Sequence, residues 1–542
     1  MLCSFVIAVR AGLQAEYCSY RLKGSAMYRH LCFLVPWAFL GCAHLDGAGK
    51  RQILPPKRVA KAKPESAQQK ISLQLHDRAN SDLKPVLEPM YAAYRVPGVT
   101  VGLVHNRQVV WTDKFGYANR DEKKPMTADT VTRIGSLTKI FTGLAILGLR
   151  DEGRLTLDDP VVSVIPELRR ILYPSTDSPR ITFRHLITHS SGLPRVGQLD
   201  YYSNPDQPVT VQALEKSLDG VQLVFSPGTA TLYSNLAMGV ASVAVDRLAG
   251  MPLRAYLEQK VFKPLGMTRT TFDNQDADRL GKATGYAPTP EGFTSQKPWA
   301  LGVVEGMGGL YSTLNDMMRF LAWQTKAWPP RNADESGWPT RASLRESHLS
   351  LGGGEGKPLV GANWIISQHP RFGLKASHTG ATQQYSAHIT MFPKAGLGVV
   401  VLANMGIDSR KQGPPAVISI AQHIIEWLEA TLPKPESKLS NALRVASESF
   451  MSIYGQPDEK AVRASFHQSF LASVPVTKMM AMFKGMRTDL GTCTIQPKKI
   501  VSPTQALFAL QCAQKAFHLM MVVDAAKPHQ IMGLTLKPAP AQ

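Results

Sequence analysis

The chain has 542 residues, too many for one small domain, and its 44% hydrophobic and 19% charged residues are typical of a globular protein with a large core. Its formal net charge of +20 favours contact with anionic surfaces such as acidic lipid or cell-wall polymer. The basic residues are spread along the chain without an RNA-recognition or helix-turn-helix signature, so we expect no nucleic-acid partner. No apolar run approaches the about 20 residues of a membrane-spanning helix.

Residues 1–42 are predicted to be a leader that carries an export signal. The segment MYRH at 27–30 places a charge before the apolar stretch 31–40, an order typical of a secretory signal, so Met27 is a candidate start. The segment FLGC at 39–42 resembles a bacterial lipoprotein box, which makes Cys42 the lipidation candidate. A merely hydrophobic N-terminus is the alternative. We expect an exported protein of the bacterial periplasm or cell envelope, lipid-anchored if Cys42 is acylated.

Residues 43–70 are predicted to be a disordered basic tether. They are rich in Gly, Ala, Pro and Lys and have no apolar period. The positive charge of this tether would hold it near an anionic membrane or cell-wall surface. Four of the six cysteines precede residue 43, so the folded part has at most one disulfide.

Residues 71–432 are predicted to form one domain of mixed helices and strands. A helical pattern near 82–94 ends at a Pro-Gly pair, and the alternating runs 99–104 and 109–111 predict a β-hairpin. The apolar runs 385–391 and 397–402 predict two neighbouring strands. Residues 417–432 predict the helix that closes the domain.

A serine and a lysine stand three residues apart, at Ser136 and Lys139, where a helix is predicted to begin. Residues i and i+3 share a helix face, so Lys139 points back toward Ser136. A serine hydroxyl is a weak nucleophile until a base takes its proton, and lysine can do so if burial or nearby cations lower its pKa. The pair is a candidate nucleophile and base, and an ordinary helix N-terminus is the alternative.

His185 and His189 are four residues apart, as in zinc-binding helices. Leu186 stands where the general-base glutamate of such a helix would be, and no third ligand is evident. We therefore predict two structural histidines and no metal.

Two further short patterns follow along the chain. Tyr233 and Asn235 stand at the entrance of the apolar helix predicted over 236–248. Tyrosine can relay protons if cations lower its pKa, and asparagine can bind a substrate amide or hold a lysine. His378 and Gly380 lie on a predicted strand, where glycine permits the backbone to approach a cleft closely.

The order S-x-x-K, Y-x-N and H-x-G resembles the serine β-lactamase / penicillin-binding-protein superfamily, and most of all its class C β-lactamase, DD-peptidase and esterase-like branch. The segments 182–194 and 308–316 serve as connecting landmarks. The resemblance runs from about Leu83 to Leu432. It implies an α+β fold, in which an antiparallel sheet is flanked by helices and accompanied by an all-helical region.

This resemblance implies a serine hydrolase that acts through an acyl-enzyme on Ser136 and needs no metal or cofactor. Lys139 and Tyr233 would share the proton transfers, and Asn235 would also orient Lys139. The N–H groups of Ser136 and Ala381 would form the oxyanion hole. The candidate substrate-binding residues are Asn235, Thr379, Gly380 and Ala381.

His378 stands where most β-lactamases carry a lysine. Histidine is mostly neutral at pH 7, so it would attract an anionic antibiotic less and could serve in proton transfer. Hydrolysis of β-lactams, of D-amino-acid peptides or amides, and of esters therefore remains open, on small-molecule or peptidoglycan-derived acyl substrates. The alternative is a catalytically silent penicillin- or cell-wall-binding protein that retains the fold.

Residues 433–439 predict a linker, and 440–542 predict a small α+β domain. Helical patterns near 440–453, 458–473 and 476–488 precede strand-like runs at 493–500, 505–513, 516–523 and 530–537. The pattern resembles the small cystatin/NTF2-like domains appended to such hydrolases. Cys493 and Cys512 are equidistant from Ser502-Pro503, so a hairpin that turns there would place them within disulfide reach. Two buried free thiols are the alternative.

Overall fold

The structure is a computed structural model that describes residues 67–539 except 202, 296, 331–336, 353–358, 409, 411, 433–438, 503, 525–526 and 528. The described residues belong to one compact unit, Glu65–Gln542. The predicted leader with Met27 and Cys42, most of the tether and most of the linker lie outside the described residues. The tether is predicted to reach residue 70, whereas helix α1 (Ala67–Arg78) already begins at Ala67.

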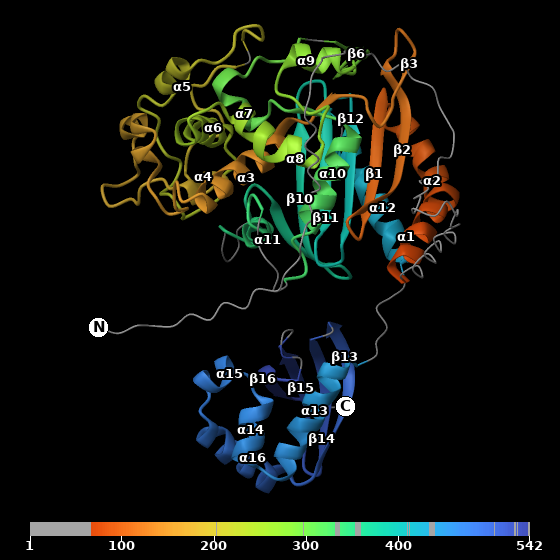
Figure 1. Cartoon of the computed structure of the whole chain (residues 1–542), viewed down its shortest axis with the longest axis vertical. Helices are drawn as coiled ribbons and strands as arrows, with labels where there is room; N and C mark the ends of the chain where they lie inside the picture. Colours follow the sequence, from red (N-terminus) through yellow and green to blue (C-terminus); the bar gives the residue numbers. More distant parts are fainter. Residues whose placement is uncertain are drawn as a thin grey trace, which may run out of the picture. The chain divides into compact units, whose positions relative to one another are not determined.

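An eight-stranded antiparallel sheet forms the centre of the region up to residue 432 (Figure 1). Its strand order is β3-β2-β1-β12-β11-β10-β9-β8. The bounds are β1 Gly98–His105, β2 Gln108–Asn119, β3 Lys124–Pro125, β8 Leu359–Val360, β9 Ile365–His369, β10 Gly373–Ala381, β11 Ser386–Phe392 and β12 Leu397–Ala403. The predicted hairpin is the pair β1–β2, and the two predicted apolar strands are the neighbours β11 and β12.

Helices cover both faces of this sheet, which explains why its central strands are continuous apolar runs rather than alternating ones. Along β12, Val399 and Val401 face the core shared with α1, α2 (Lys84–Ala93) and α12 (Ala416–Thr431). Val400 and Leu402 face the opposite core, which α10 (Leu314–Thr325) helps to form. Figure 1 shows α10 and α12 on opposite sides of the sheet.

A helical region packs around the second of these cores. Its α-helices are α3 Thr138–Asp151, α4 Phe183–Ile187, α5 Val211–Ser217, α6 Asn235–Ala249, α7 Leu253–Leu257, α8 Lys263–Leu265, α9 Asn274–Arg279 and α11 Arg341–Ser347. Shorter 3-10 turns occur at Gly135–Leu137, Val161–Ser163, Pro166–Arg170 and Gly302–Met307, and π-helical turns at Ala79–Leu83 and Glu258–Phe262. Two small ribbons pair β4 (Thr132–Arg133) with β7 (Tyr311–Ser312) and β5 (Ala287–Thr289) with β6 (Gly292–Thr294).

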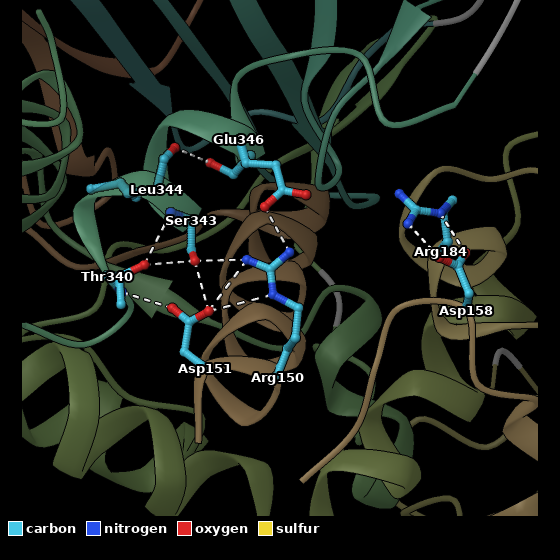
Figure 2. Close-up of polar contacts among 9 residues, drawn as sticks. Arg150, Asp151, Asp158, Arg184, Thr340, Ser343, Leu344 and Glu346 are labelled. Carbon is cyan, nitrogen blue, oxygen red and sulfur yellow. Dashed lines mark hydrogen bonds and ion pairs between the residues drawn. The ribbon is translucent and has the colours of Figure 1, made fainter. Parts of the chain in front are cut away.

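Helix α3 is tied to α11 at its C-terminal end by a polar cluster (Figure 2). Arg150 Nη1 donates to Glu346 Oε2 at 2.6 Å. Asp151 accepts hydrogen bonds from Ser343 Oγ at 2.7 Å and from the Thr340 N–H at 2.8 Å. These contacts fix the C-terminal end of α3. Lys139 lies at the N-terminal end of the same helix.

Within the described ranges, no single helix has the length and apolar character needed to cross a membrane. One bent pair, Asn235–Ala249 with Leu253–Leu265 at 72°, meets the test by length and composition when the two are taken together.

The region after residue 439 has a hydrophobic core of its own. Its helices are α13 Asn441–Gly455, α14 Glu459–Ser465, α15 Gln468–Ser473 and α16 Val476–Leu490, and its strands are β13 Cys493–Ser502, β14 Gln505–Cys512, β15 Ala516–Val523 and β16 Ile531–Pro538. The strands form an antiparallel meander in chain order. This small α+β arrangement of helices followed by strands is the one predicted from the sequence.

Cys493 and Cys512 face each other across the β13–β14 hairpin and are joined by a disulfide bond. Their Cα atoms lie 3.9 Å apart. The bond closes a stretch of 19 residues, so it links the first and second strands of the meander covalently.

Candidate active site

Ser136 lies in the 3-10 turn Gly135–Leu137, directly before α3. Gly135 has φ of +54°, a left-handed conformation that favours glycine. A Cβ at Gly135 would lie 2.7 Å from the backbone nitrogen of Ala381, so glycine also permits the turn to approach β10 closely. The turn leaves the Ser136 side chain half-buried, beside the last residues of that strand.

Lys139 contacts the Ser136 hydroxyl from the first turn of α3. Its Nζ lies 3.1 Å from Ser136 Oγ and also donates to the carbonyl of Met307. The side chain is 0% exposed. Burial, assisted by the positive charge of Arg195, holds the pKa of Lys139 well below its usual value. The neutral amine is therefore favoured, and its lone pair can accept a proton from Ser136.

Tyr233 lies immediately before α6 and packs among basic side chains. Its ring centroid is 4.9 Å from Lys139 Nζ, 5.3 Å from Arg195 Cζ and 4.5 Å from the ring of His189. Burial raises the pKa of Tyr233 to about 12, although a hydrogen bond with Ser136 and the charge of Arg195 act in the opposite direction. The pKa is therefore not lowered by the neighbouring cations, because desolvation outweighs them.

Asn235 begins α6, and its side-chain amide contacts Tyr201. Its Nδ2 donates to the Tyr201 hydroxyl at 3.0 Å. The resemblance gives Asn235 the task of orienting Lys139, which stays a prediction, and the structure adds a contact of the lysine with the Met307 carbonyl. The sequence could not indicate this contact, because backbone carbonyls leave no trace in a sequence motif.

His378 is buried on β10, with 4% of its surface exposed. Its Nδ1 donates to the carbonyl of Thr379 at 2.9 Å, and its ring centroid is 6.2 Å from that of Tyr233. Burial first, and then the charge of Lys139, lower the pKa of His378 to about 3. The imidazole is therefore neutral at physiological pH, as its ordinary pKa already indicates.

The Thr379 hydroxyl forms a hydrogen bond with the neighbouring strand β11. Oγ1 lies 2.8 Å from Nδ1 of His388, its register partner on β11, and His388 Nε2 lies 2.7 Å from Thr390 Oγ1. Alternation along β10 places His378 and Gly380 on one face and Thr379 on the other. The Thr379 hydroxyl is thus engaged within the sheet.

Gly380 and Ala381 bring β10 against the nucleophile turn. A Cβ on Gly380 would lie 1.9 Å from the carbonyl oxygen of Ile134 and 3.2 Å from the nitrogen of Ser136. Only glycine permits this approach, because real Cβ contacts are longer. The close approach places the backbone amides of Ser136 and Ala381 in the same small region, which is the arrangement that an oxyanion hole requires.

His185 and His189, which are four residues apart, form hydrogen bonds with different partners. His185 Nδ1 accepts from the Thr182 N–H at 3.2 Å within a capping box at the start of α4. His189 Nδ1 accepts from the Ser234 N–H at 3.3 Å. Among the described residues, no group of three or more His, Cys, Asp or Glu side chains could hold a metal ion.

Three participants were not identified from the sequence: the Met307 carbonyl, Arg195 and the pair Glu305–Arg254. Arg254 Nε donates to Glu305 Oε1 at 3.0 Å, and the Glu305 carbonyl accepts from the N–H groups of Gly308 and Gly309. These contacts fix the 3-10 turn Gly302–Met307, which presents the Met307 carbonyl to Lys139. The sequence has glycines at 306, 308 and 309 in this loop, but they do not reveal that it contacts Lys139.

Solved structures share the fold. A structure of the octameric penicillin-binding protein homologue from Pyrococcus abyssi aligns with a TM-score of 0.54 at 20% identity, covering 85% of this chain and 98% of that one. A class C beta lactamase from Rhodobacter sphaeroides aligns with a TM-score of 0.51 at 21% identity, covering 64% and 99%. The chain therefore has the fold of the serine β-lactamase and penicillin-binding-protein superfamily.

Sequence comparisons define the family more narrowly. The Beta-lactamase family profile matches residues 83–422, and the chain belongs to this family. Protein flp of Staphylococcus aureus is 26% identical over 341 residues, which are 62% of this chain and 64% of that protein. Beta-lactamase-like protein 2 of Dictyostelium discoideum is 33% identical over 226 residues, 40% of each chain. The chain thus matches less than two thirds of the length of either relative.

Proposed function

We propose that the protein is a serine hydrolase that forms an acyl-enzyme on Ser136. The observation that supports this most is the contact between Lys139 Nζ and Ser136 Oγ at 3.1 Å, made by a fully buried lysine with a strongly lowered pKa. A neutral lysine in hydrogen-bond reach is a competent general base for a serine hydroxyl. Family membership supports the same class of chemistry.

In the proposed reaction, Lys139 takes the proton of Ser136 as its oxygen attacks the acyl carbon of the substrate. The amides of Ser136 and Ala381 stabilise the oxyanion that develops. Tyr233, which keeps its proton at neutral pH, donates it to the departing nitrogen or oxygen, and Lys139 can return the Ser136 proton to Tyr233. Water then attacks the acyl-enzyme by the same route in reverse and frees Ser136.

The substrate is proposed to be a small-molecule or peptidoglycan-derived acyl compound: an ester, a D-amino-acid peptide or amide, or a β-lactam. The neutral, buried His378 itself supplies no permanent cation for a substrate carboxylate, so it does not single out the β-lactams. The alternative is a catalytically silent penicillin- or cell-wall-binding protein that retains the fold.

The test is the intact mass of the full chain after incubation with a fluorescent penicillin and, separately, with a fluorophosphonate. We expect an adduct in the wild type, none in Ser136→Ala, and an unchanged adduct in Ser367→Ala, whose serine is exposed on β9. Decay of the penicillin adduct would indicate β-lactamase turnover, and persistence would indicate penicillin binding. No adduct with either probe would contradict the proposal and favour the silent binding protein.

A further inference from the structure

Arg195 stands at the edge of the candidate site on a backbone that is firmly held. Its carbonyl accepts the N–H groups of Asn235 at 2.7 Å and Leu236 at 3.2 Å, which are the first residues of α6. Ser234 Oγ donates to the neighbouring carbonyl of Pro194 at 2.8 Å. The segment that carries Arg195 is therefore fixed to the helix entrance that carries Tyr233.

The guanidinium of Arg195 lies over the ring of Tyr233, with Cζ 5.3 Å from the ring centroid. Lys139 Nζ is 4.9 Å from the same centroid. Arg195 and the proposed base Lys139 therefore both contact the ring of Tyr233. A planar guanidinium packed on an aromatic ring keeps its N–H edges free for an acceptor.

The side chain of Arg195 is exposed to solvent. Across the described ranges, no carboxylate lies within ion-pair distance of its guanidinium, whereas Arg247 is paired with Glu167 and Lys297 with Asp206. Since a permanent cation at a cleft attracts anions, such a charge beside a nucleophile acts on the substrate itself.

The end of strand β10 that lies beside Ser136 offers no comparable charge to a substrate. His378 is buried and neutral with Nδ1 bound to the Thr379 carbonyl, and the Thr379 hydroxyl is bound to His388. A substrate carboxylate can instead meet Arg195, which lies over the Tyr233 ring and belongs to the segment between α4 and α6.

We propose that Arg195 forms an anion subsite that binds a carboxylate of the acyl substrate and so selects anionic substrates. This inference rests on the proposed serine hydrolase function. The fork of a guanidinium matches a carboxylate with two parallel hydrogen bonds, and such charge-assisted pairs are among the strongest polar contacts.

The test compares two esters that differ in one group, 3-carboxyphenyl phenylacetate and 3-carbamoylphenyl phenylacetate, on the full chain. In Arg195→Gln we expect the ratio of kcat/KM for the carboxylate ester to kcat/KM for the carboxamide to fall about 10- to 100-fold. Arg195→Lys should retain part of the preference. The proton transfers are common to both esters. The ratio of their kcat/KM values therefore cancels any effect of Arg195 on those transfers.

Arg180→Gln is the matched control. Arg180 is also exposed and also lies over a tyrosine ring, with Cζ 5.0 Å from the centroid of Tyr173, but it has no contact with the candidate site as described above. This variant should leave the ratio unchanged. An equal loss on both esters in Arg195→Gln, or no loss on either, would overturn the anion subsite.

Binding to Ser136→Ala separates this inference from the proposed function, because that variant cannot form an acyl-enzyme. Calorimetry should show tighter binding of the carboxylate ester than of the carboxamide, and the difference should vanish in Ser136→Ala/Arg195→Gln. If the wild type hydrolyses neither ester but this binding difference is present, the proposed function fails and the subsite stands. If binding does not discriminate, the subsite is wrong whatever the activity.

Discussion

At the level of single residues, burial acts in opposite directions on the two proposed proton carriers. Desolvation penalises the charged form, so it lowers the pKa of Lys139 and raises that of Tyr233 to about 12. Burial therefore favours the neutral form of both groups, with the free lone pair on Lys139 and the proton on Tyr233. The same physical cause thus assigns the base and the acid of the proposed reaction to two residues in contact.

The pH dependence of kcat/KM with a neutral ester should reveal this assignment. Activity needs neutral Lys139, so it should rise with pH through the pKa of Lys139, which Arg195 helps to depress. Removal of that cation in Arg195→Gln raises this pKa, and the acidic limb of the profile should move to higher pH. Arg180→Gln should not move it. A uniform loss of rate with the limb unmoved would show that Arg195 does not act on Lys139.

At the level of elements, the 3-10 turn Gly302–Met307 positions the base from outside its own helix. The turn contains Glu305, a carboxylate with 6% of its surface exposed that is paired with Arg254. Burial raises the pKa of Glu305 to about 7, even though the hydrogen bond and charge of Arg254 oppose that rise. The loop that presents the Met307 carbonyl to Lys139 therefore contains a group that titrates near neutrality.

Glu305 should make stability depend on pH. The folded state binds a proton here between pH 4.5, the ordinary pKa of a glutamate, and about pH 7, where the unfolded state does not. The free energy of unfolding therefore falls as pH rises through this window. The loss approaches roughly 3 kcal/mol above pH 7.

Chemical denaturation at several pH values checks this expectation on Glu305→Gln, which cannot titrate. Its free energy of unfolding should change less between pH 4.5 and 7 than that of the wild type. Asp246, whose pKa burial raises to about 6, titrates in both proteins, so a smaller dependence on pH remains in the variant. Parallel slopes in the two proteins would contradict the role given to Glu305.

At the level of the whole molecule, the described chain is built around separate hydrophobic cores. One lies on each face of the large sheet, and another is formed wholly by residues after 438. The disulfide between Cys493 and Cys512 belongs to this last core, where it joins two strands of a four-stranded meander. Its contribution should therefore be local to that region.

Cys493→Ser/Cys512→Ser should destabilise the region 441–539 by about 3 kcal/mol, because the bond restricts a loop of 19 residues in the unfolded chain. Hydrogen exchange followed by mass spectrometry should show at least about tenfold faster exchange there and unchanged protection in α3. Fluorophosphonate labelling of Ser136 should persist. Equal loss of protection in α3, or free thiols in the oxidised wild type, would contradict this expectation.

Much of the fold could be predicted because local patterns carry it. The apolar runs of β11 and β12, the strand β1 and the four strands after residue 492 lie close to their predicted bounds. The returning strand β2 was expected over 109–111 and continues to Asn119. Element ends were less predictable: the helix expected near Asp82–Tyr94 extends back to Ala67 with a π-helical turn between its halves. The polar sequence over 67–78 gave little sign of it, because contacts with the neighbouring sheet stabilise that helix.

The sequence by itself determined which chemical groups are present and their order: Ser136 and Lys139 at helical spacing, Tyr233 at a helix entrance and Gly380 on a strand. Tertiary structure alone decided how those groups act. It buried Lys139, left Tyr233 half-buried and placed the Asn235 amide against Tyr201. It also brought the Met307 carbonyl to the lysine and laid the Arg195 guanidinium over the tyrosine ring. The physical reason is that pKa values and charge pairing depend on desolvation and on neighbours far apart in the chain, which spacing along the sequence does not encode.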